Sequence, residues 1–346
     1  MKVLLIGGTG TISAAIARKI SEKGWDLWIL NRGNRNEVLP AGTKELICDI
    51  NDEADTSAKL QKHSFDVVAD FIVFNTAQAE RDYRLFKGKT KQYIYISSAS
   101  VYQKPPADYR ISESTPHANP FWQYSRNKIA CEEFFMSKYR EEGFPVTMVL
   151  PSHTYDERRV PVGIHGANGS WQVVKRMMDG KPVIIHGDGT SLWTMTFNTD
   201  FAAAFVGLMG NIHAIGESVQ ITSDETLTWN QIYEAIASAL NVPLKAVHIS
   251  SEFLAQADLL LEKPYDFRGS LLGDKSNSVV FDNTKLKRLV PGFRAKLRFD
   301  EGVKKAVDYV LSHKEYQTED PEFDSWCDRI IAAQERALNW GVGSGE

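Results

Sequence analysis

The stretch KVLLIGGTGTIS, Lys2–Ser13, runs an apolar strand directly into a glycine-rich turn at the start of the chain. Glycines in such a turn let the backbone approach a pyrophosphate closely, and the helix that follows offers unpaired N–H groups at its positive end. Apolar residues recur at helical spacing from Ile12 to Ile20, and Gly24 stands where a C-terminal cap is expected. The stretch predicts a dinucleotide-binding strand–turn–helix. Only Gly7-x-x-Gly10 of the fuller glycine pattern is present, so a strand–turn–helix without a ligand is the alternative.

Length and charge exclude several classes of protein. The 346 residues are enough for one cofactor domain and a smaller partner region. A formal net charge of −4 without a long basic run argues against a dedicated nucleic-acid binder. The apolar N-terminus is too short for a signal peptide or a membrane span, and three scattered cysteines fit a reducing cytosol. We therefore expect a cytoplasmic protein without membrane contact, whose last residues, 341–346, fray.

Short apolar runs alternate with helical or polar segments through the first 150 residues. Because strands that alternate with helices form parallel sheets, the fold class predicted is α/β, a Rossmann-type doubly wound sheet. The ligand belongs at the carboxyl ends of its strands. The predicted strands are Val3–Ile6, Leu27–Leu30, Glu45–Ile47, Val67–Phe71, Tyr93–Ser97 and Val146–Leu150.

After Pro151 the pattern loosens and predicts a smaller C-terminal α/β region interleaved with the first. We expect a dinucleotide-binding domain at 1–150, completed by about 183–225, and a substrate-binding region formed by 151–182 and 226–340. Beyond 150 the sequence predicts a strand at Ser218–Thr222, helices at Trp229–Leu240, Thr284–Leu289 and Gly302–Leu311, and loops at Asn211–Gly216 and Lys263–Asn277.

Two segments carry residues suited to redox chemistry. Tyr124 and Lys128 are four apart on one helix face, where the ammonium favours the phenolate and the tyrosine can exchange a proton with a substrate oxygen. The alternative is an exposed, solvated face. Upstream, a buried strand ends in hydroxyls at Ser97, Ser98 and Ser100, which can orient that oxygen or simply satisfy local backbone groups.

On these residues the chain resembles an extended short-chain dehydrogenase/reductase of the NAD-dependent epimerase/dehydratase family. The resemblance covers about residues 1 to 240 and rests on GGTGTIS at 7–13, on SSASVY at 97–102, on Tyr124 and Lys128, and on Gly187-Asp-Gly followed by Asp200. It implies a catalytic set of Ser98, Tyr124 and Lys128, in which Lys128 also binds the cofactor ribose.

The resemblance also implies the other contacts of the site. Pro151 would flank the nicotinamide, and Asp49, which can equally be a turn-forming residue, would contact the adenine. His153, two residues after Pro151, would face the substrate, the alternative being a hydrogen-bonded loop histidine. Trp193 is a candidate for lining the substrate pocket, with core packing as an equal or better alternative. The cofactor-binding residues implied are Gly7, Gly10, Thr11, Ile12, Asn31, Arg32, Asp49, Lys128 and Pro151.

Some residues differ from the motifs of this family, and these differences argue against particular reactions and substrates. Ala99 and Ser100 replace the Asp-Glu pair of sugar-nucleotide 4,6-dehydratases, so dehydration of that type is not expected. Trp193 replaces an Arg that grips the nucleotide diphosphate, and an indole cannot make those bidentate bonds. A nucleotide-sugar partner then needs another cation, for which the sequence offers Arg158, Arg159, Lys175 and Arg176.

The second strand bears on the choice of cofactor. An acidic residue at its end would bind the ribose 2′-hydroxyl of NAD and repel a 2′-phosphate, but here Asn31 is neutral and Arg32 is cationic. NADP is slightly favoured over NAD on that ground. A metal is not expected, because His153, His165 and His186 lack ligand spacing.

The sequence thus predicts an NAD(P)-dependent oxidoreductase or epimerase that acts on a sugar or nucleotide-sugar-like carbinol or ketone. The resemblance also implies a homodimer. The competing hypothesis is a non-catalytic cofactor-sensing or RNA-binding protein on the same fold. It arises because Asn31-Arg32-Gly33 and Asp70-Phe71 are similar to the atypical branch that includes the chloroplast stem-loop RNA-binding proteins.

Overall fold

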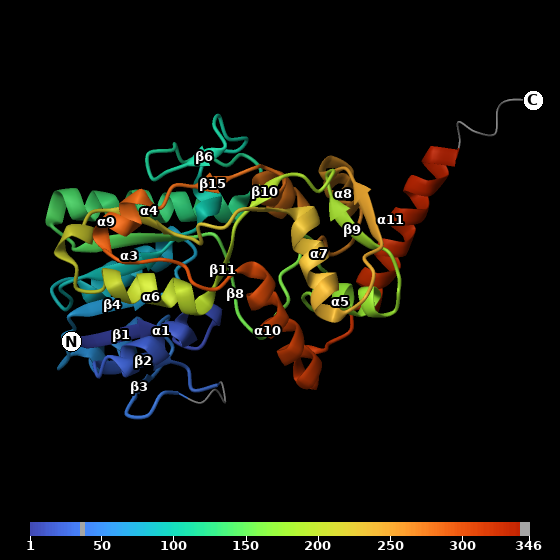
Figure 1. Ribbon diagram of the computed structural model, residues 1–346. Helices are drawn as coiled ribbons and strands as arrows, with labels where there is room; N and C mark the ends of the chain where they lie inside the picture. The colour runs from blue at the N-terminus through green and yellow to red at the C-terminus, as the bar shows by residue number, and fades with distance from the viewer. Residues whose placement is uncertain (35–38, 340–346) are drawn as a thin grey trace, which may run out of the picture.

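The computed structural model describes residues 1–34 and 39–339, and it contains a seven-stranded sheet in the order β12-β7-β5-β4-β1-β2-β3. Every neighbouring pair is parallel. The expected Rossmann-type doubly wound sheet is confirmed (Figure 1). Its strands are β1 (Lys2–Ile6), β2 (Asp26–Asn31), β3 (Lys44–Ile47), β4 (Val67–Asp70), β5 (Tyr93–Ile96), β7 (Val146–Pro151) and β12 (Ser218–Ile221).

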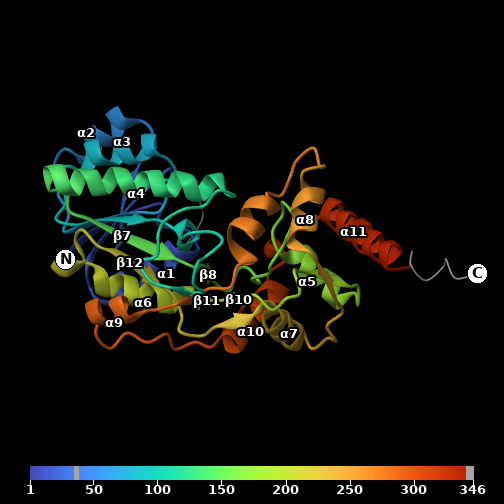
Figure 2. The same ribbon diagram turned by 90° about the horizontal axis from the view of Figure 1, so that it is seen from above.

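Helices cover both faces of this sheet, as Figure 2 shows. Alternate residues of β1 supply two cores: Leu4 and Ile6 enter one, and Val3 and Leu5 enter the other. A strand buried on both faces needs the continuous apolar run that opens this chain. One face carries α1 (Thr11–Glu22), α6 (Asn198–Leu208) and α9 (Thr284–Leu289), and the other carries α2 (Glu53–Leu60), α3 (Thr76–Phe86) and α4 (Gln123–Glu142).

A smaller body lies beside the carboxyl ends of the sheet (Figures 1 and 2). It contains the parallel pair β9 (Val183–His186) and β14 (Ala246–Ile249), together with α5 (Trp171–Met178), α7 (Trp229–Leu240), α8 (Ser251–Asp258), α10 (Phe299–Ser312) and α11 (Pro321–Asn339). Three further short strand pairs lie outside the large sheet: β8 (His153–Tyr155) with β11 (Met195–Phe197), β10 (Leu192–Trp193) with β13 (Leu227–Thr228), and β6 (Arg110–Ile111) with β15 (Val280–Phe281).

The chain returns to the sheet later than the expected residue 183. The strand β9 pairs with β14 in the smaller body, and it is β11, α6 and β12 that lie with the sheet. Hydropathy cannot distinguish a strand of the large sheet from one of a two-stranded pair, because both are buried apolar runs. Residues 340–346, expected to fray, lie outside the described residues.

The prediction of a loop at 263–277 is wrong, because Arg268–Lys275 forms a π-helix. Its two glycines lie against the start of α4: a Cβ on Gly269 would lie 2.1 Å from Trp122 Cδ1, and one on Gly273 would lie 3.0 Å from Trp122 Cβ. Close packing explains these glycines, which the sequence analysis interpreted as loop signals. π-helical turns have no 3.6-residue pattern to detect and often occur at functional sites.

Buried carboxyl groups meet beneath the end of β4. Asp70 is fully buried, its Oδ1 accepts from Ile72 N at 2.5 Å, and its carboxyl adjoins that of Asp82. Asp82 in turn accepts from Tyr93 Oη at 2.5 Å and Arg81 Nε at 2.8 Å. Burial, and then the neighbouring Asp82 carboxylate, raise the pKa of Asp70 well above its usual value. At a pH above the usual pKa of aspartate, the buried Asp70 carboxyl therefore lowers the stability of the folded protein.

Asp70→Asn is expected to raise the free energy of unfolding at pH 7 by about 1–2 kcal/mol, since the amide keeps the shape without the charge. The gain should vanish below about pH 3, where Asp70 is protonated in both folded and unfolded chains. Urea denaturation at both pH values measures it. Asp26→Asn is the control of opposite sign, because the Lys44 ammonium lowers the pKa of Asp26. A loss of stability in Asp70→Asn at pH 7 would contradict this account.

No helix of residues 1–34 and 39–339 is long and apolar enough to cross a membrane. The same residues contain no group of three or more His, Cys, Asp or Glu arranged to hold a metal ion.

Candidate active site

The glycine turn after β1 has the geometry of a phosphate loop. Gly7 has φ +80°, and a Cβ there would lie 2.7 Å from Ile72 Cγ2. Ser13 stands where the fuller glycine pattern has its third glycine, and it closes the turn: its Oγ donates to Gly7 O and accepts from Gly10 N, both at 2.8 Å. A Cβ on Gly10 would meet only Ser13 Oγ, at 3.5 Å, so space next to this residue is open. Thr11 then begins α1.

The residues predicted to hold the adenosine half lie at the next two strand ends. Asn31 ends β2, where its Oδ1 accepts from Gly33 N at 2.8 Å and its Nδ2 donates to Glu45 Oε2 at 3.1 Å. Arg32 is exposed beside it. Asp49 follows β3, and its Oδ1 accepts from the backbone and side-chain nitrogens of Asn51 at 3.0 Å, which is the turn geometry considered above.

Ser98 lies next to the helix face that carries Tyr124 and Lys128, although it belongs to a different element. Ser98 follows β5 and hydrogen-bonds to the Tyr124 hydroxyl at the start of α4. Ser98 Oγ lies 2.9 Å from Ser100 Oγ, and Ser125 Oγ donates to Ser100 Oγ at 2.8 Å. These hydrogen bonds fix the position of the Ser98 hydroxyl. The carboxyl end of β5 and the first turn of α4 therefore form one constellation.

The charges of this constellation are set by burial. Burial raises the pKa of Tyr124 to about 12, although the Ser98 hydrogen bond opposes the shift, so the phenol is protonated at neutral pH. Burial lowers the pKa of Lys128 to about 8. The Lys128 ammonium donates to Val73 O at 2.6 Å and Ile96 O at 2.8 Å and lies 5.8 Å from the Tyr124 ring centroid. Those two carbonyls use two of its three N–H groups.

At the carboxyl end of the strand next to β5, Pro151 ends β7, and His153 begins β8. Trp193 Nε1 donates to His153 Nδ1 at 3.3 Å, which puts the imidazole proton on Nε2. Burial lowers the pKa of His153 to about 3, so the ring is neutral. Trp193 itself is 3% exposed and lies 5.5 Å from the Trp229 ring, so it orients the imidazole more than it presents a surface.

The π-helix adds two charged residues near these side chains that the sequence did not indicate. The Asp274 carboxylate acts electrostatically on Tyr124, and the Lys275 ammonium acts on His153. Lys104, which is 4% exposed, lies with its Nζ 3.8 Å from Asp274 Oδ1. No local signal marks these residues, because their approach depends on how Arg268–Lys275, a segment distant in sequence from α4, packs against the start of that helix.

The four cations suggested as replacements for the phosphate-binding Arg differ in whether they are paired with a carboxylate. Arg158 pairs with Asp156 at 2.6 Å. Arg176 pairs with Asp324 and Asp328, each at 2.7 Å, and Lys175 pairs with Asp179 at 3.2 Å. Within the described part of the chain, Arg159 is the member of this set without a carboxylate partner, and it acts electrostatically on His153.

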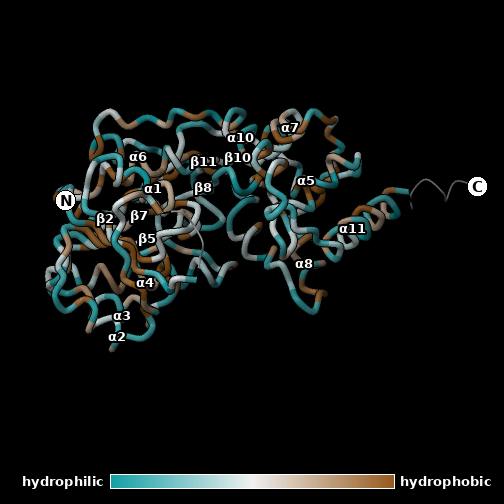
Figure 3. Tube along the Cα trace, turned by 90° about the horizontal axis from the view of Figure 1, so that it is seen from below, coloured by the Kyte–Doolittle hydropathy of each residue, from teal (hydrophilic) through white to brown (hydrophobic). Residues whose placement is uncertain are grey.

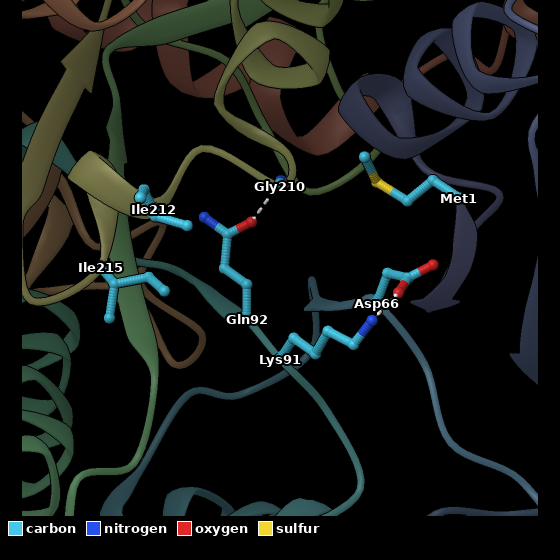
Figure 4. Close-up of a pocket in the computed structure, with 7 residues that line it drawn as sticks. All are labelled: Met1, Asp66, Lys91, Gln92, Gly210, Ile212 and Ile215. Atoms are coloured by element: carbon cyan, nitrogen blue, oxygen red, sulfur yellow. Dashed lines mark hydrogen bonds and ion pairs between the residues drawn. The ribbon is translucent and has the colours of Figure 1, made fainter.

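Figure 4 shows a different pocket, at the edge of the sheet where β1 and β5 begin. Gln92 Oε1 accepts from Gly210 N at 2.7 Å there, and Lys91 pairs with Asp66 at 2.8 Å. Parallel strands bind ligands at their carboxyl ends, so this pocket is separate from the candidate active site. Its lining residues are Met1, Asp66, Lys91, Gln92, Gly210, Ile212 and Ile215.

Comparison with known proteins finds a matching family and similar sequences. The model of the NAD dependent epimerase/dehydratase family matches residues 3–222. The 2′-dehydrokanamycin reductase of Streptomyces kanamyceticus is 24% identical over 295 residues, 85% of this chain and 80% of that protein. The chloroplast stem-loop binding protein of 41 kDa b from Arabidopsis thaliana is 25% identical over 288 residues, 77% and 70% respectively.

Solved structures share the fold. The UDP-glucuronic acid 4-epimerase of Bacillus cereus, solved in complex with NAD, aligns with a TM-score of 0.70 at 18% identity over 90% of this chain and 99% of that one. The epimerase Mth375 of Methanothermobacter thermautotrophicus aligns with a TM-score of 0.72 at 16% identity, covering 90% and 93%.

Proposed function

The chain belongs to the NAD-dependent epimerase/dehydratase family, and from that premise we propose that it reduces a ketone to a carbinol on a sugar-like substrate, with Tyr124 as the proton donor. The observation that carries this proposal is the protonated Tyr124 phenol, hydrogen-bonded to Ser98 and within reach of the buried Lys128 ammonium. An acid, a hydrogen-bond donor and a cation around one substrate position are what carbonyl reduction requires.

The cofactor, when bound, supplies the hydride that attacks the carbonyl carbon. Tyr124 Oη gives its proton to the carbonyl oxygen, so that hydride and proton together convert the ketone to the carbinol. Ser98 Oγ donates a hydrogen bond to the same oxygen. The Lys128 ammonium stabilises the phenolate that remains, until solvent returns the proton.

The residues on the cofactor side fit a dinucleotide. Gly10 and the N–H groups at Thr11 and Ile12 would hold the pyrophosphate, Asp49 the adenine, and Lys128 with Pro151 the nicotinamide riboside. Because these groups lie at the ends of neighbouring strands, one extended cofactor can span them.

The end of β2 supports the use of both NADPH and NADH. The exposed Arg32 favours a 2′-phosphate, whereas the Glu45 carboxylate, bonded to Asn31, opposes it. We expect a modest preference for NADPH.

Two features favour reduction over epimerisation. The Tyr124 phenol, whose raised pKa keeps it protonated, suits a reaction that begins with proton donation. The similar protein from Streptomyces kanamyceticus is named a reductase. Ala99 and Ser100, in place of an acidic pair, argue against dehydration.

We expect the purified protein to consume one NADPH for each carbinol formed from a ketosugar, and to use NADH less efficiently. Absorbance at the reduced-nicotinamide band and chromatography of the sugar measure the two quantities. A changed sugar configuration without net cofactor consumption would establish an epimerase instead. Cofactor binding without turnover on any ketosugar would favour a binding function, such as the one named for the similar chloroplast stem-loop binding protein.

A further inference from the structure

The two oxygens of the Asp49 carboxylate differ in their hydrogen bonds. Oδ1 accepts from the backbone nitrogen and from Nδ2 of Asn51, both at 3.0 Å. A carboxylate oxygen accepts about two hydrogen bonds, so Oδ1 is fully used. Within residues 1–34 and 39–339 no donor hydrogen-bonds to Oδ2. The exposed Asp49 side chain therefore offers one oxygen to a ligand.

The backbone that carries Asp49 is fixed beside the end of β2. The register of the sheet pairs Ile47 with Asn31, and Cys48 N donates to Asn31 O at 2.9 Å. Asp49 O accepts from Thr56 Oγ1 at 3.1 Å, and Thr56 is fully buried in α2. Asp49 is thus held at the end of the site where the adenosine half of the cofactor is expected.

The guanidinium of Arg81 determines how the Asn51 amide is oriented. Asn51 lies just before α2 and Arg81 lies in α3, and these two helices are side by side (Figure 3). Arg81 Nη1 donates to Asn51 Oδ1 at 2.7 Å. A guanidinium only donates and a carboxylate only accepts, so a single orientation of the amide satisfies both neighbours. The amide oxygen faces Arg81, and the amide nitrogen faces Asp49.

Arg81 is itself held by a buried carboxylate. The Arg81 side chain is 7% exposed, and its Nε donates to Asp82 Oδ1 at 2.8 Å. Asp82 is fully buried, and its Oδ2 accepts from Tyr93 Oη at 2.5 Å. A guanidinium with one edge on a carboxylate has a fixed direction. A continuous chain of hydrogen bonds therefore runs from the core to the surface through Tyr93, Asp82, Arg81, Asn51 and Asp49.

An oxygen that only accepts distinguishes between purine bases. It attracts the 6-amino group of adenine, which donates, and repels the 6-oxo group of hypoxanthine or guanine, which accepts. We propose that Arg81 and Asn51 are positioning residues that hold Asp49 Oδ2 as the acceptor for the adenine amino group, so that the site selects adenine over oxopurine dinucleotides. This inference rests on the proposed function, which assigns Asp49 to the adenine of the cofactor.

Equilibrium binding of two dinucleotides tests the inference without turnover. The probes are NADPH and its hypoxanthine analogue, in which an oxo group replaces the 6-amino group, and the fluorescence of the reduced nicotinamide gives both Kd values. The wild type is expected to bind NADPH about tenfold more tightly than the analogue. Arg81→Lys and Asn51→Ala should each reduce this ratio to about twofold or less. A merely structural role would weaken both dinucleotides alike and leave the ratio unchanged.

The variants are chosen to preserve the fold. Arg81→Lys keeps a cation for the buried Asp82 but lacks the fork that also holds Asn51. Arg84→Lys is the matched control, because the Arg84 guanidinium donates from the same helix to the Glu53 carboxylate, at 2.8 and 2.9 Å, and should keep the wild-type ratio. Asp49→Asn, whose amide can donate to an oxo group, should shift the preference toward the analogue.

The inference is overturned if the wild type binds both dinucleotides equally well or binds neither, or if Arg81→Lys and Asn51→Ala keep the wild-type ratio. A loss of the ratio in Asn51→Ala with a wild-type ratio in a folded Arg81→Lys would refute the role of Arg81. If Arg81→Lys folds poorly, Asn51→Ala decides, since Asn51 is exposed.

Tyr124→Phe separates this inference from the proposed function, because it should keep the ratio and lose turnover. Selective binding of NADPH without turnover of any ketosugar refutes the reductase and keeps the role of Arg81 and Asn51. Turnover with unselective binding does the reverse.

Discussion

Tyr124→Phe is expected to lower kcat for ketone reduction by about 10²–10⁴-fold and to leave the Kd for NADPH within about twofold. The substitution removes only the hydroxyl that hydrogen-bonds to Ser98. The ring keeps its packing against Trp122, with centroids 4.9 Å apart. Stopped-flow absorbance measures turnover, and cofactor fluorescence measures binding.

The matched control for this substitution is Tyr109→Phe, which removes a hydroxyl from a side chain that is 54% exposed. It should leave kcat unchanged. A Tyr124→Phe protein that turns over at the wild-type rate would show that the proton comes from elsewhere. Loss of both turnover and cofactor binding would mean that the phenol supports the cofactor site rather than the chemistry.

The cofactor half of the molecule could be predicted because its signals are local. A buried parallel strand must be apolar on both faces, so the strand at Val3–Ile6 can be predicted from its own residues alone. The helix face that pairs Tyr124 with Lys128 follows from a spacing of four. Even Ser13, an apparent defect in the glycine pattern, replaces a glycine by closing the turn with two hydrogen bonds.

The substrate half could not be predicted, because its residues are placed by long-range packing. Gly269 and Gly273 resemble loop residues in sequence, yet they are small because Trp122 packs on them. Asp274 comes near Tyr124 because these glycines pack against Trp122. Trp193 is of a residue type that often lines pockets. In the structure, however, it packs against Trp229, and its N–H hydrogen-bonds to His153 and orients that ring.

Lys128 governs the last prediction, a fall in kcat/KM for reduction as the pH rises above about 8. Burial lowers the pKa of Lys128 to about 8, so the charged form that stabilises the Tyr124 phenolate prevails below this pH and is lost above it. Because kcat/KM reports the free enzyme, its logarithm should be flat from about pH 6 to 7.5 and then decline with a slope near −1. Tyr124, with a pKa of about 12, adds no inflection in that range.

Lys128→Met should abolish the inflection and lower kcat/KM at pH 7 by about 10²-fold or more, because the phenolate loses its cation in a buried site where charges interact strongly. Lys138→Met, at an ammonium paired with Glu142 on the same helix, should keep the wild-type profile. An inflection that persists in Lys128→Met would assign the titration to another group. A wild-type profile that stays flat to pH 10 would contradict the role given to the Lys128 charge in stabilising the Tyr124 phenolate.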